Sequence, residues 1–532
     1  MGCTMVGVLF TEVVETSAAV AATRSRLAKV AALAEPVRRM STPAVVSFLV
    51  GVPSQGRIGA GYRTVQAIAP PPAERPQLTV SEVDEALGGY AAISGRGAAR
   101  RRVEALTALF GRATEAEQDF LRRLLTGELR QGALEGVMLD AIARAAEVPG
   151  EVVRRAFMLS GSLPGTAVAA LAGEAALAAF RLEVGRPVRP MLASPAESLP
   201  AALAELGPCV VEHKLDGARI QVHRSGDEVR VFTRTLREIT ATVPELVELV
   251  RGLPCTSAVL DGETLALDDD GKPRPFQETM SRFGALLEAT PAGPRTSVGG
   301  ARELLLSPFF FDCLHLDGVD LLDEPLRVRL AALREAAGDH VIPGAVEPDE
   351  PRAAQVLAAA LAAGQEGVVV KSLESVYAAG RRGRSWQKVK PVHALDLVVL
   401  GVEWGSGRRQ GLLSNLHLGA RDPDGGPPVM VGKTFKGLTD ELLAWQTREL
   451  LARATDRGDW LVTVRPELVV EVELDGVQVS PRYPGGVALR FARVVRYRPD
   501  KGPAEADTID AVRALLPKGG DPSAGATPDP AP

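Results

Sequence analysis

Hydrophobic and polar positions follow a helical period in the first third of the chain. Over residues 9–180, Ala and Leu recur at the three- and four-residue spacing of amphipathic helices. Clusters of Pro and Gly at 51–61 and 70–76 interrupt this period and divide the region into short helices. The period is clearest in 17–33, 114–125 and 134–146. The pattern predicts an all-α domain.

The pattern changes after a segment with two prolines, Val184–Met191, which predicts a linker. Residues 192–391 alternate apolar strand-like runs with a few helices, such as 243–251 and 353–363. This is an α+β pattern. The remainder is rich in short strand-like runs, with one helix near 440–453. We predict a small five-stranded β-barrel of the OB-fold type there.

These patterns together predict a multidomain chain with a short tail. The tail is rich in Pro, Gly, Ala and Asp and is predicted to be disordered, because such a composition buries too little apolar surface to fold. The predicted boundaries are 1–185 for the helical domain, 186–393 for the α+β domain, 394–515 for the barrel and 516–532 for the tail.

Composition limits the function classes. A chain of 532 residues has room for about three domains. Its net charge of −5 excludes a passive basic coat for nucleic acid, so any nucleic-acid contact must come from local patches. No run is long and apolar enough to span a bilayer, and the N-terminus lacks the layout of a signal peptide. We expect a cytoplasmic protein without membrane contact.

The cysteines agree with a reducing compartment. They are far apart and form no CxxC pair, which excludes a zinc ribbon. Three of them lie in apolar strand-like runs, where core packing is the expected role. The four are Cys3, Cys209, Cys255 and Cys313.

The main candidate for chemistry is Lys214, in the K-x-D-G-x-R box of residues 212–219. An amine attacks phosphorus only when it is neutral, exposed and close to a compensated phosphate. An acidic neighbour, a strand that ends in an Asp-Gly turn and Arg219 supply those conditions. Alone, the box also fits a surface hairpin.

Further charged segments follow in a fixed order. Each is an apolar strand-like run that ends or begins with a charged residue. Side chains alternate along a strand, so the two lysines of the W-Q-K-V-K run share one face. The segments are D-G-E at 261–263, F-F-F-D at 309–312, E-G-V-V-V-K at 366–371, W-Q-K-V-K at 386–390 and a basic run over 489–501.

This ordered series resembles the covalent nucleotidyltransferase superfamily, and within it the ATP-dependent DNA ligases. The segment Gly127–Gly136 is similar to the signature of the DNA-binding domain of these ligases. The resemblance covers nearly the whole chain, most closely in the single-chain bacterial and archaeal form. It implies an enzyme that transfers AMP from ATP to a lysine, then to the 5′-phosphate of a nick, before the 3′-hydroxyl seals the strand, in replication, repair or recombination.

The resemblance also implies a role for each charged position. Lys214 is the expected nucleophile, and Glu212 is expected to accept a hydrogen bond from the adenine amino group. Phe311 is expected to stack on the purine. Glu263 and Glu366 are the expected metal carboxylates, with Glu263 as an alternative ribose ligand. Cations expected at the ribose and phosphates are Arg219, Arg234, Lys371, Arg382, Lys388, Lys390, Arg493 and Lys501. Arg234 lies in Thr-Arg-Thr where the family usually has Ser-Arg-Asn, which leaves the role of Thr235 open.

The reaction itself requires such a site. A triphosphate and its leaving pyrophosphate carry several negative charges, so catalysis depends on positioning and electrostatic compensation. Magnesium is the expected ion, because it prefers oxygen ligands and is held by one or two carboxylates together with phosphate.

Local basic clusters provide the expected DNA contact. With aromatic residues at only 4%, single-strand base stacking is a poor explanation, and recognition of a duplex through its backbone is a better one. No base-reading motif is visible, so we expect a monomer that binds nicked double-stranded DNA without sequence specificity. The clusters are Arg96 with Arg100–Arg102, Arg122 with Arg123 and Arg130, and Arg408 with Arg409, Lys433 and Lys436.

The residues alone also allow other interpretations of these motifs. Phe309–Phe311 is more often core than a purine platform, and Arg381–Arg384 alone is typical of a solvated loop. The six histidines are scattered, and we expect none to pair with a Ser and an Asp. An RNA ligase or a capping guanylyltransferase shares the K-x-D-G core, and a non-catalytic DNA-end scaffold is an alternative of another class. The long helical region before Lys214 disfavours the first two, and the filled pocket positions disfavour the third.

Overall fold

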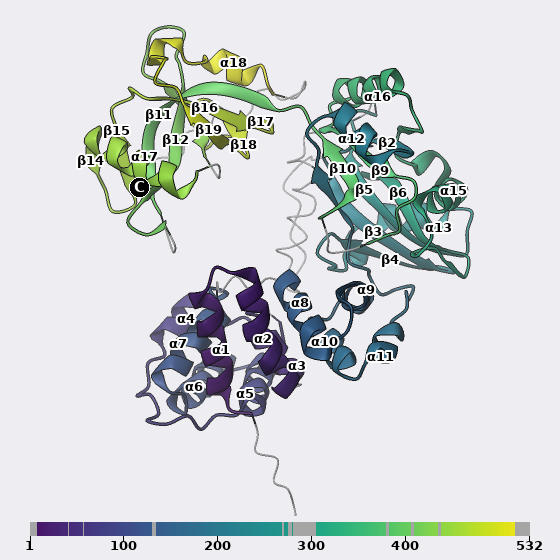
Figure 1. Ribbon diagram of the computed structural model, residues 1–532, viewed down its shortest axis with the longest axis vertical. Helices are drawn as coiled ribbons and strands as arrows, with labels where there is room; N and C mark the ends of the chain where they lie inside the picture. Colours follow the sequence, from purple (N-terminus) through teal and green to yellow (C-terminus); the bar gives the residue numbers. More distant parts are fainter. Residues whose placement is uncertain are drawn as a thin grey trace, which may run out of the picture.

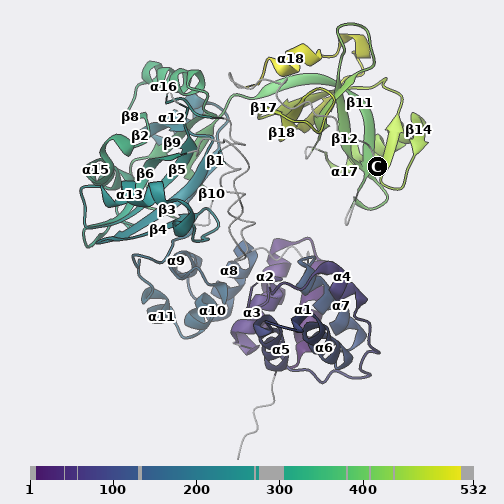
Figure 2. The same ribbon diagram turned by 180° about the vertical axis from the view of Figure 1, so that it is seen from behind.

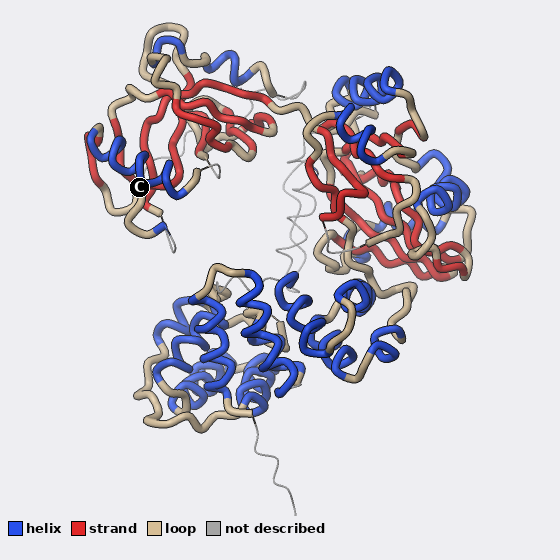
Figure 3. The backbone as a smooth tube through the Cα atoms, in the orientation of Figure 1, coloured by secondary structure: helices blue, strands red, loops and turns tan. Residues whose placement is uncertain are grey.

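The computed structural model describes residues 8–40, 42–56, 58–129, 135–268, 271–274, 279, 305–378, 382–405, 409–434 and 438–516. Three regions follow one another along the chain: a helical region, a two-sheet α/β core and a C-terminal sheet region (Figures 1 and 2). Helices dominate the first and strands the other two (Figure 3). Among the described residues, no helix has the length and apolar character needed to cross a membrane.

The N-terminal region is helical, as the period of its apolar residues predicts. Its core includes edge-to-face contacts of Phe10 with Phe48 and Phe120, at centroid distances of 5.8 and 5.5 Å. Capping boxes at Thr79 and Thr114 fix the start of two helices. The helices are α1 (Phe10–Ala22), α2 (Arg26–Met40), α3 (Pro43–Leu49), α4 (Tyr62–Ala67), α5 (Val80–Ala92), α6 (Ala98–Gly111), α7 (Glu115–Thr126), α8 (Glu135–Ala146), α9 (Gly150–Ser160), α10 (Leu163–Leu171) and α11 (Glu174–Ala178).

The central region contains two five-stranded sheets. The first has the order β1-β10-β9-β2-β8 and the second β4-β3-β5-β6-β7. In the first sheet these are β1 (Leu192–Pro195), β10 (Arg382–Val389), β9 (Gly367–Ser372), β2 (Cys209–Lys214) and β8 (Gly344–Val346). In the second they are β4 (Glu228–Thr233), β3 (Ala218–Ser225), β5 (Ser257–Ala266), β6 (Leu306–Leu316) and β7 (Val319–Asp320).

Helices pack on both sheets. The helices α12 (Leu199–Leu206) and α16 (Glu350–Ala362) pack on the first sheet, and α13 (Pro244–Arg251) and α15 (Leu326–Ala337) on the second. A separate apolar cluster includes residues of both sheets, among them Val259, Phe311 and Trp386. The predicted α+β pattern is therefore an arrangement in which the two sheets share a buried core.

The C-terminal region is built around the long strand β11 (His393–Trp404). One edge of β11 pairs with β12, and the other pairs first with β16 and then with β15. Its main sheet has seven strands where a five-stranded barrel was predicted, and β14, β15 and β19 are only four or five residues long. The other elements are β12 (Leu413–Ala420), β13 (Val429–Lys433), α17 (Asp440–Ala452), β14 (Ala454–Arg457), β15 (Leu461–Val464), β16 (Val469–Leu474), β17 (Gly476–Val479), β18 (Val487–Arg490), β19 (Arg493–Tyr497) and α18 (Ile509–Arg513).

The proline-containing segment before β1 is attached to the core, in contrast to the predicted linker. Val188 donates to Gln221 Oε1 at 2.7 Å and accepts from Gln221 Nε2 at 3.1 Å. The backbone N–H of Gly185 donates to His223 Nδ1 at 2.9 Å. Met158 of α9 belongs to the same apolar cluster as Phe311. The boundary at residue 185 stays a prediction, but the chain on both sides of it packs against the core.

Candidate active site

A cavity of about 570 Å³ lies in the central region, and residues of both sheets line it. Most of the predicted site residues converge there, although they are up to 176 positions apart in the sequence (212 to 388). Those that line it are Glu212, Lys214, Arg219, Arg234, Glu263, Phe311, Lys371 and Lys388.

Close backbone approaches explain two glycines of the motifs around this cavity. A Cβ on Gly217, in the turn after Lys214, would lie 2.4 Å from the carbonyl oxygen of Thr264. Gly367 has a φ of 140°, and a Cβ there would lie 2.2 Å from the carbonyl oxygen of Val389. Only glycine allows these strands to come so close, which brings the ends of β2, β5 and β10 around one space.

The reactive end of the cavity is organised by Glu366. Its carboxylate forms ion pairs with Lys214 and, at 2.5 Å, with Lys390. Burial alone would raise the pKa of Glu366, but the two ammonium groups outweigh burial and lower it to about 2. Glu366 is therefore a carboxylate at neutral pH, and it fixes the ammonium group of Lys214 at the mouth of β2.

Glu263 is a second carboxylate near Lys214. Burial raises the pKa of Glu263 to about 7, against the opposing effects of Lys214 and Arg219. Glu366 contributes to the same rise, so the two carboxylates are close enough to repel each other. A divalent cation relieves such repulsion, and one or two carboxylates are the protein share of a typical magnesium site. The described residues contain no group of three or more potential metal ligands.

Arg219 is held firmly beside the cavity. Its guanidinium makes a bidentate contact with Asp261, at 3.0 and 2.6 Å, and donates to the carbonyl of Met191 at 2.7 Å. The hydroxyl of Tyr377 donates to the same Asp261 at 2.6 Å. The sequence did not indicate that Asp261 and Tyr377 belong to the site. Asp261 was interpreted only as the first residue of the D-G-E turn, and Tyr377 lies outside any motif.

The other end of the cavity is aromatic. Of the three phenylalanines of β6, only Phe311 lines the cavity, while Phe310 is in the core of the second sheet. The ammonium of Lys371 lies 4.4 Å from the Phe311 ring and 4.3 Å from the Trp386 ring. It also pairs with Glu212 at 2.5 Å. This geometry gives no support to the predicted phosphate role of Lys371, whose ammonium is buried between rings.

Among the described residues, the C-terminal region contributes three ion pairs that the sequence did not predict. Arg490, at the end of β18, makes a bidentate contact with Asp216 of the K-x-D-G box at 2.7 and 3.2 Å. Arg490 also lies 3.6 Å from Glu366, and Asp475 lies 3.5 Å from Lys390. The basic run of the sequence could have indicated Arg490 as a site residue, because Arg490 lies three residues before Arg493 in that run.

Other predicted cations lie elsewhere in this structure. Arg493 pairs with Glu473 at 2.8 Å, and Lys501 pairs with Asp396 at 2.5 Å, both within the C-terminal region. Their nucleotide role stays a prediction. The side chain of Arg382 and residues Arg130, Arg408, Lys436 and 517–532 are outside the described residues.

Part of the predicted DNA-contact clusters is used within the helical region. Arg101 and Arg102 donate to backbone carbonyls of Ser94 and Ile93 at 2.7 and 2.9 Å. Arg123 pairs with Asp119 at 2.6 Å. These arginines stabilise the helices, so the DNA contact of this region stays a prediction.

One histidine does join a Ser and an Asp, against our expectation. His315 Nε2 lies 3.1 Å from the hydroxyl of Ser257, and His315 Nδ1 lies 2.7 Å from Asp320. The backbone N–H of Gly318 donates to the same hydroxyl at 3.2 Å. These contacts connect the β6–β7 turn to the start of β5, and none of these residues lines the cavity.

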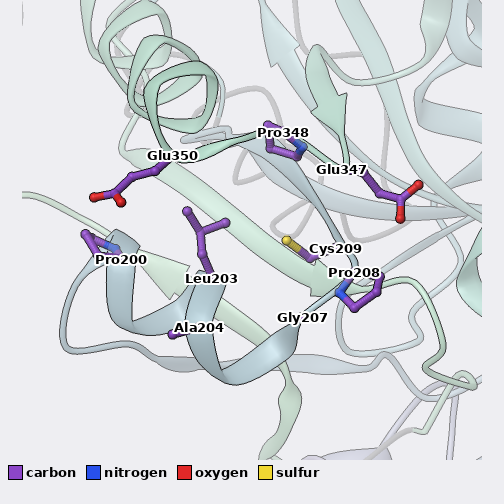
Figure 4. Close-up of a pocket in the computed structure, with 9 residues that line it drawn as sticks. All are labelled: Pro200, Leu203, Ala204, Gly207, Pro208, Cys209, Glu347, Pro348 and Glu350. Carbon is purple, nitrogen blue, oxygen red and sulfur yellow. The ribbon is translucent and has the colours of Figure 1, made fainter.

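A second cavity, of about 380 Å³, lies between α12 and the start of α16 (Figure 4). Leu203 and Cys209 point toward its centre, and the carboxylates of Glu347 and Glu350 are on its rim. None of its lining residues is a cation. It therefore lacks the charge needed to hold a triphosphate.

Comparisons with known proteins agree with this geometry. Residues 55–143 match the family described as "DNA ligase N terminus", residues 190–390 match "ATP dependent DNA ligase domain", and residues 409–501 match "ATP dependent DNA ligase C terminal region". A "Probable DNA ligase" of Rhodococcus jostii (strain RHA1) is 67% identical over 515 residues, which cover 96% of this chain and 100% of that protein.

A second relative supports the same family, and one solved structure is similar in fold. A "Probable DNA ligase" of Saccharopolyspora erythraea is 65% identical over 512 residues, covering 96% of this chain and 98% of that one. The solved chain "Pmar-Lig_Pre." is 17% identical, with a TM-score of 0.58, and covers 92% of this chain and 99% of its own; it is similar in fold. From its three family matches and its highly identical relatives, the chain belongs to the ATP-dependent DNA ligases.

Proposed function

We propose that this enzyme seals nicks in duplex DNA by transferring AMP from ATP through Lys214. The observation that supports this most directly is the convergence of Lys214, two carboxylates and an aromatic platform on one cavity. In the first step, the ammonium of Lys214 loses a proton to solvent, and the lone pair of the neutral amine attacks the α-phosphorus of ATP. An N–P bond forms, the bond to the pyrophosphate oxygen breaks so that pyrophosphate leaves, and the nitrogen loses a second proton to solvent.

The remaining residues are assigned by their position along the cavity. Phe311 stacks on the adenine, and Glu212 accepts a hydrogen bond from its amino group. Arg219, held by Asp261, contacts the ribose or the phosphate. Lys388 and Lys390 compensate the phosphate charge near Lys214. Burial, together with Lys390 and Lys214, lowers the pKa of Lys388, as expected for a cation among cations.

Magnesium fits the reactive end of this cavity. Glu263 and Glu366 are the residues that would hold it, and phosphate oxygens would complete the ligands. The ion would supply charge compensation for the triphosphate. The raised pKa of Glu263 supports this assignment. Its buried carboxylate is costly to form alone, and a bound cation would stabilise the ionised form.

The C-terminal region is proposed to be an OB-type barrel that covers the cavity. The pairing of β11 with β12 on one edge and with both β16 and β15 on the other supports a curved, barrel-like sheet. The enzyme is proposed to act as a monomer in the cytoplasm on nicked DNA. The free, buried Cys209, Cys255 and Cys313 support a reducing compartment.

Two measurements test this proposal. Incubation with α-labelled ATP and magnesium should give a labelled protein band on a denaturing gel, and a nicked duplex should be sealed in the same reaction. A band from GTP but not ATP would indicate a capping-type enzyme. A protein that takes no label from either nucleotide would be a scaffold, and sealing confined to RNA strands would indicate an RNA ligase.

A further inference from the structure

Lys371 and Glu212 form a buried ion pair at the aromatic end of the cavity. The nitrogen–oxygen distance is 2.5 Å, and their side chains are only 3% and 4% exposed. They lie on the neighbouring strands β9 and β2, so the sheet itself fixes their relative position.

Lys371 is held from several sides. Its ammonium lies against the rings of Phe311 and Trp386, at 4.4 and 4.3 Å, and donates to the carbonyl of Phe311 at 3.1 Å. Aromatic faces and a carbonyl favour a cation over a neutral amine. This ammonium is therefore a fixed positive charge behind the base-binding end of the cavity.

Glu212 retains an acceptor atom. Its Oε2 atom lies 2.5 Å from the Lys371 ammonium, and its side chain lines the cavity. A carboxylate has several lone-pair sites, so one that pairs with a single ammonium can still accept a hydrogen bond from a ligand in the cavity.

We propose that Lys371 is a positioning residue for base selection, which keeps Glu212 an ionised acceptor for the 6-amino group of adenine. This rests on the proposed adenine contact of Glu212. It replaces the phosphate role predicted for Lys371. A protonated Glu212 keeps a carbonyl oxygen that can accept, but it has lost its negative charge and presents a hydroxyl on the other oxygen, so it binds the amino group more weakly.

The charges around Glu212 determine whether it stays ionised. Burial raises the pKa of Glu212, and Lys371 is the main group that opposes the rise. Asp312 on β6 adds to the rise, although Arg329 pairs with that carboxylate at 2.7 Å, and Arg334 on α15 has a weak opposing effect. Loss of Lys371 should therefore raise the pKa of Glu212 further and favour its protonated form.

The test compares ATP with purine riboside triphosphate, which lacks only the 6-amino group. Full-length enzyme is incubated with each nucleotide, and the rate of lysyl-adenylate or lysyl-purine-nucleotide formation is measured at limiting nucleotide concentration. We expect the wild type to prefer ATP by about 10- to 100-fold, the range for a hydrogen bond to a charged group. In Lys371→Met the preference should fall by at least about 3-fold at pH 7 and recover toward the wild-type value as the pH rises.

Matched variants separate the possible failures. Lys390→Met removes a cation from the other end of the cavity, so both nucleotides should slow equally. If Glu212→Met, which has no acceptor oxygen, keeps the full preference for ATP, the adenine contact itself is wrong. If Glu212→Met removes the preference but Lys371→Met keeps it at pH 7, only the role of Lys371 is wrong.

A double variant covers the case in which Lys371→Met does not fold. Glu212→Met with Lys371→Met removes both members of the buried pair, which costs much less than leaving one charge alone. If Lys371 acts only through Glu212, the double variant should match Glu212→Met in its preference at every pH. A further loss shared by both nucleotides would instead show direct contact of Lys371 with the base, and would overturn the proposal.

Discussion

The contact between Arg490 and Asp216 joins the C-terminal region to the nucleotide site, so its removal should affect one stage of the reaction and not the other. Arg490→Ala removes two charge-assisted hydrogen bonds, of 2.7 and 3.2 Å. The side chains are 19% and 22% exposed, so the pair is partly shielded from solvent. A pair of this kind contributes about 1–3 kcal/mol.

That free energy sets the expected size of the effect. It corresponds to about a 5- to 150-fold change in the equilibrium between this arrangement and one in which the C-terminal region is turned away. Arg490→Ala should slow the sealing of a pre-adenylylated nick by about 10-fold if this arrangement is the one that acts on DNA. Formation of lysyl-AMP should stay within about 2-fold of wild type.

The assay measures both rates on the same preparations. Arg490→Lys should be intermediate, because an ammonium keeps the charge but not the bidentate geometry. Arg496→Ala is the matched control: its side chain is 64% exposed and pairs with Glu471 of the same region. Equal slowing of both steps by Arg490→Ala, or normal sealing, would refute the reasoning.

Four further outcomes are expected. Lys214→Arg should fold normally but take no label from ATP, because a guanidinium stays protonated; any labelled band would contradict the assignment. Asp261→Asn should lower the free energy of unfolding by about 3 kcal/mol in denaturant titrations, since it leaves the buried Arg219 unpaired; an unchanged midpoint would contradict this. Glu263→Gln should raise Tm over wild type at pH 8 but not at pH 5. The pKa of Glu263 is about 7 in the folded protein and 4.5 in the unfolded chain, so the wild type loses stability as the pH rises between these two values. An equal change in Tm at both pH values would argue against this reasoning. Lys501→Ala should slow lysyl-AMP formation more than sealing of a pre-adenylylated nick, and the reverse pattern would count against a first-step role.

Local patterns in the sequence were sufficient for many elements of the fold. The predicted helices at 243–251, 353–363 and 440–453 correspond to α13, α16 and α17, each within three residues at either end. The aromatic run at 309–312 is part of β6. Periodicity specifies such elements because each depends on neighbours along the chain.

Pairings between distant residues could not be predicted in the same way. Asp216 and Arg490 are 274 positions apart, and no local pattern indicates that they meet. For Lys371, the motif correctly predicted a strand. It did not predict the direction in which the Lys371 ammonium points. That direction follows from packing against Trp386 on β10, which depends on the register of β9 and β10.

The basic run at the end of the chain connects these observations. Arg490 reaches the K-x-D-G box, while Arg493 and Lys501 pair with Glu473 and Asp396 inside their own region. The C-terminal region presents Arg490 to the cavity. The same region keeps Arg493 and Lys501 away from the cavity, because its own carboxylates pair with them. If all three act on the nucleotide, they must do so at different stages, with a rotation of the C-terminal region between them. In this structure, Arg490 pairs with Asp216 while carboxylates of the C-terminal region hold Arg493 and Lys501, so a rotation would have to exchange these pairs for contacts with phosphate. Such an exchange suits an enzyme that must first bind a free nucleotide and then admit DNA to the same lysine.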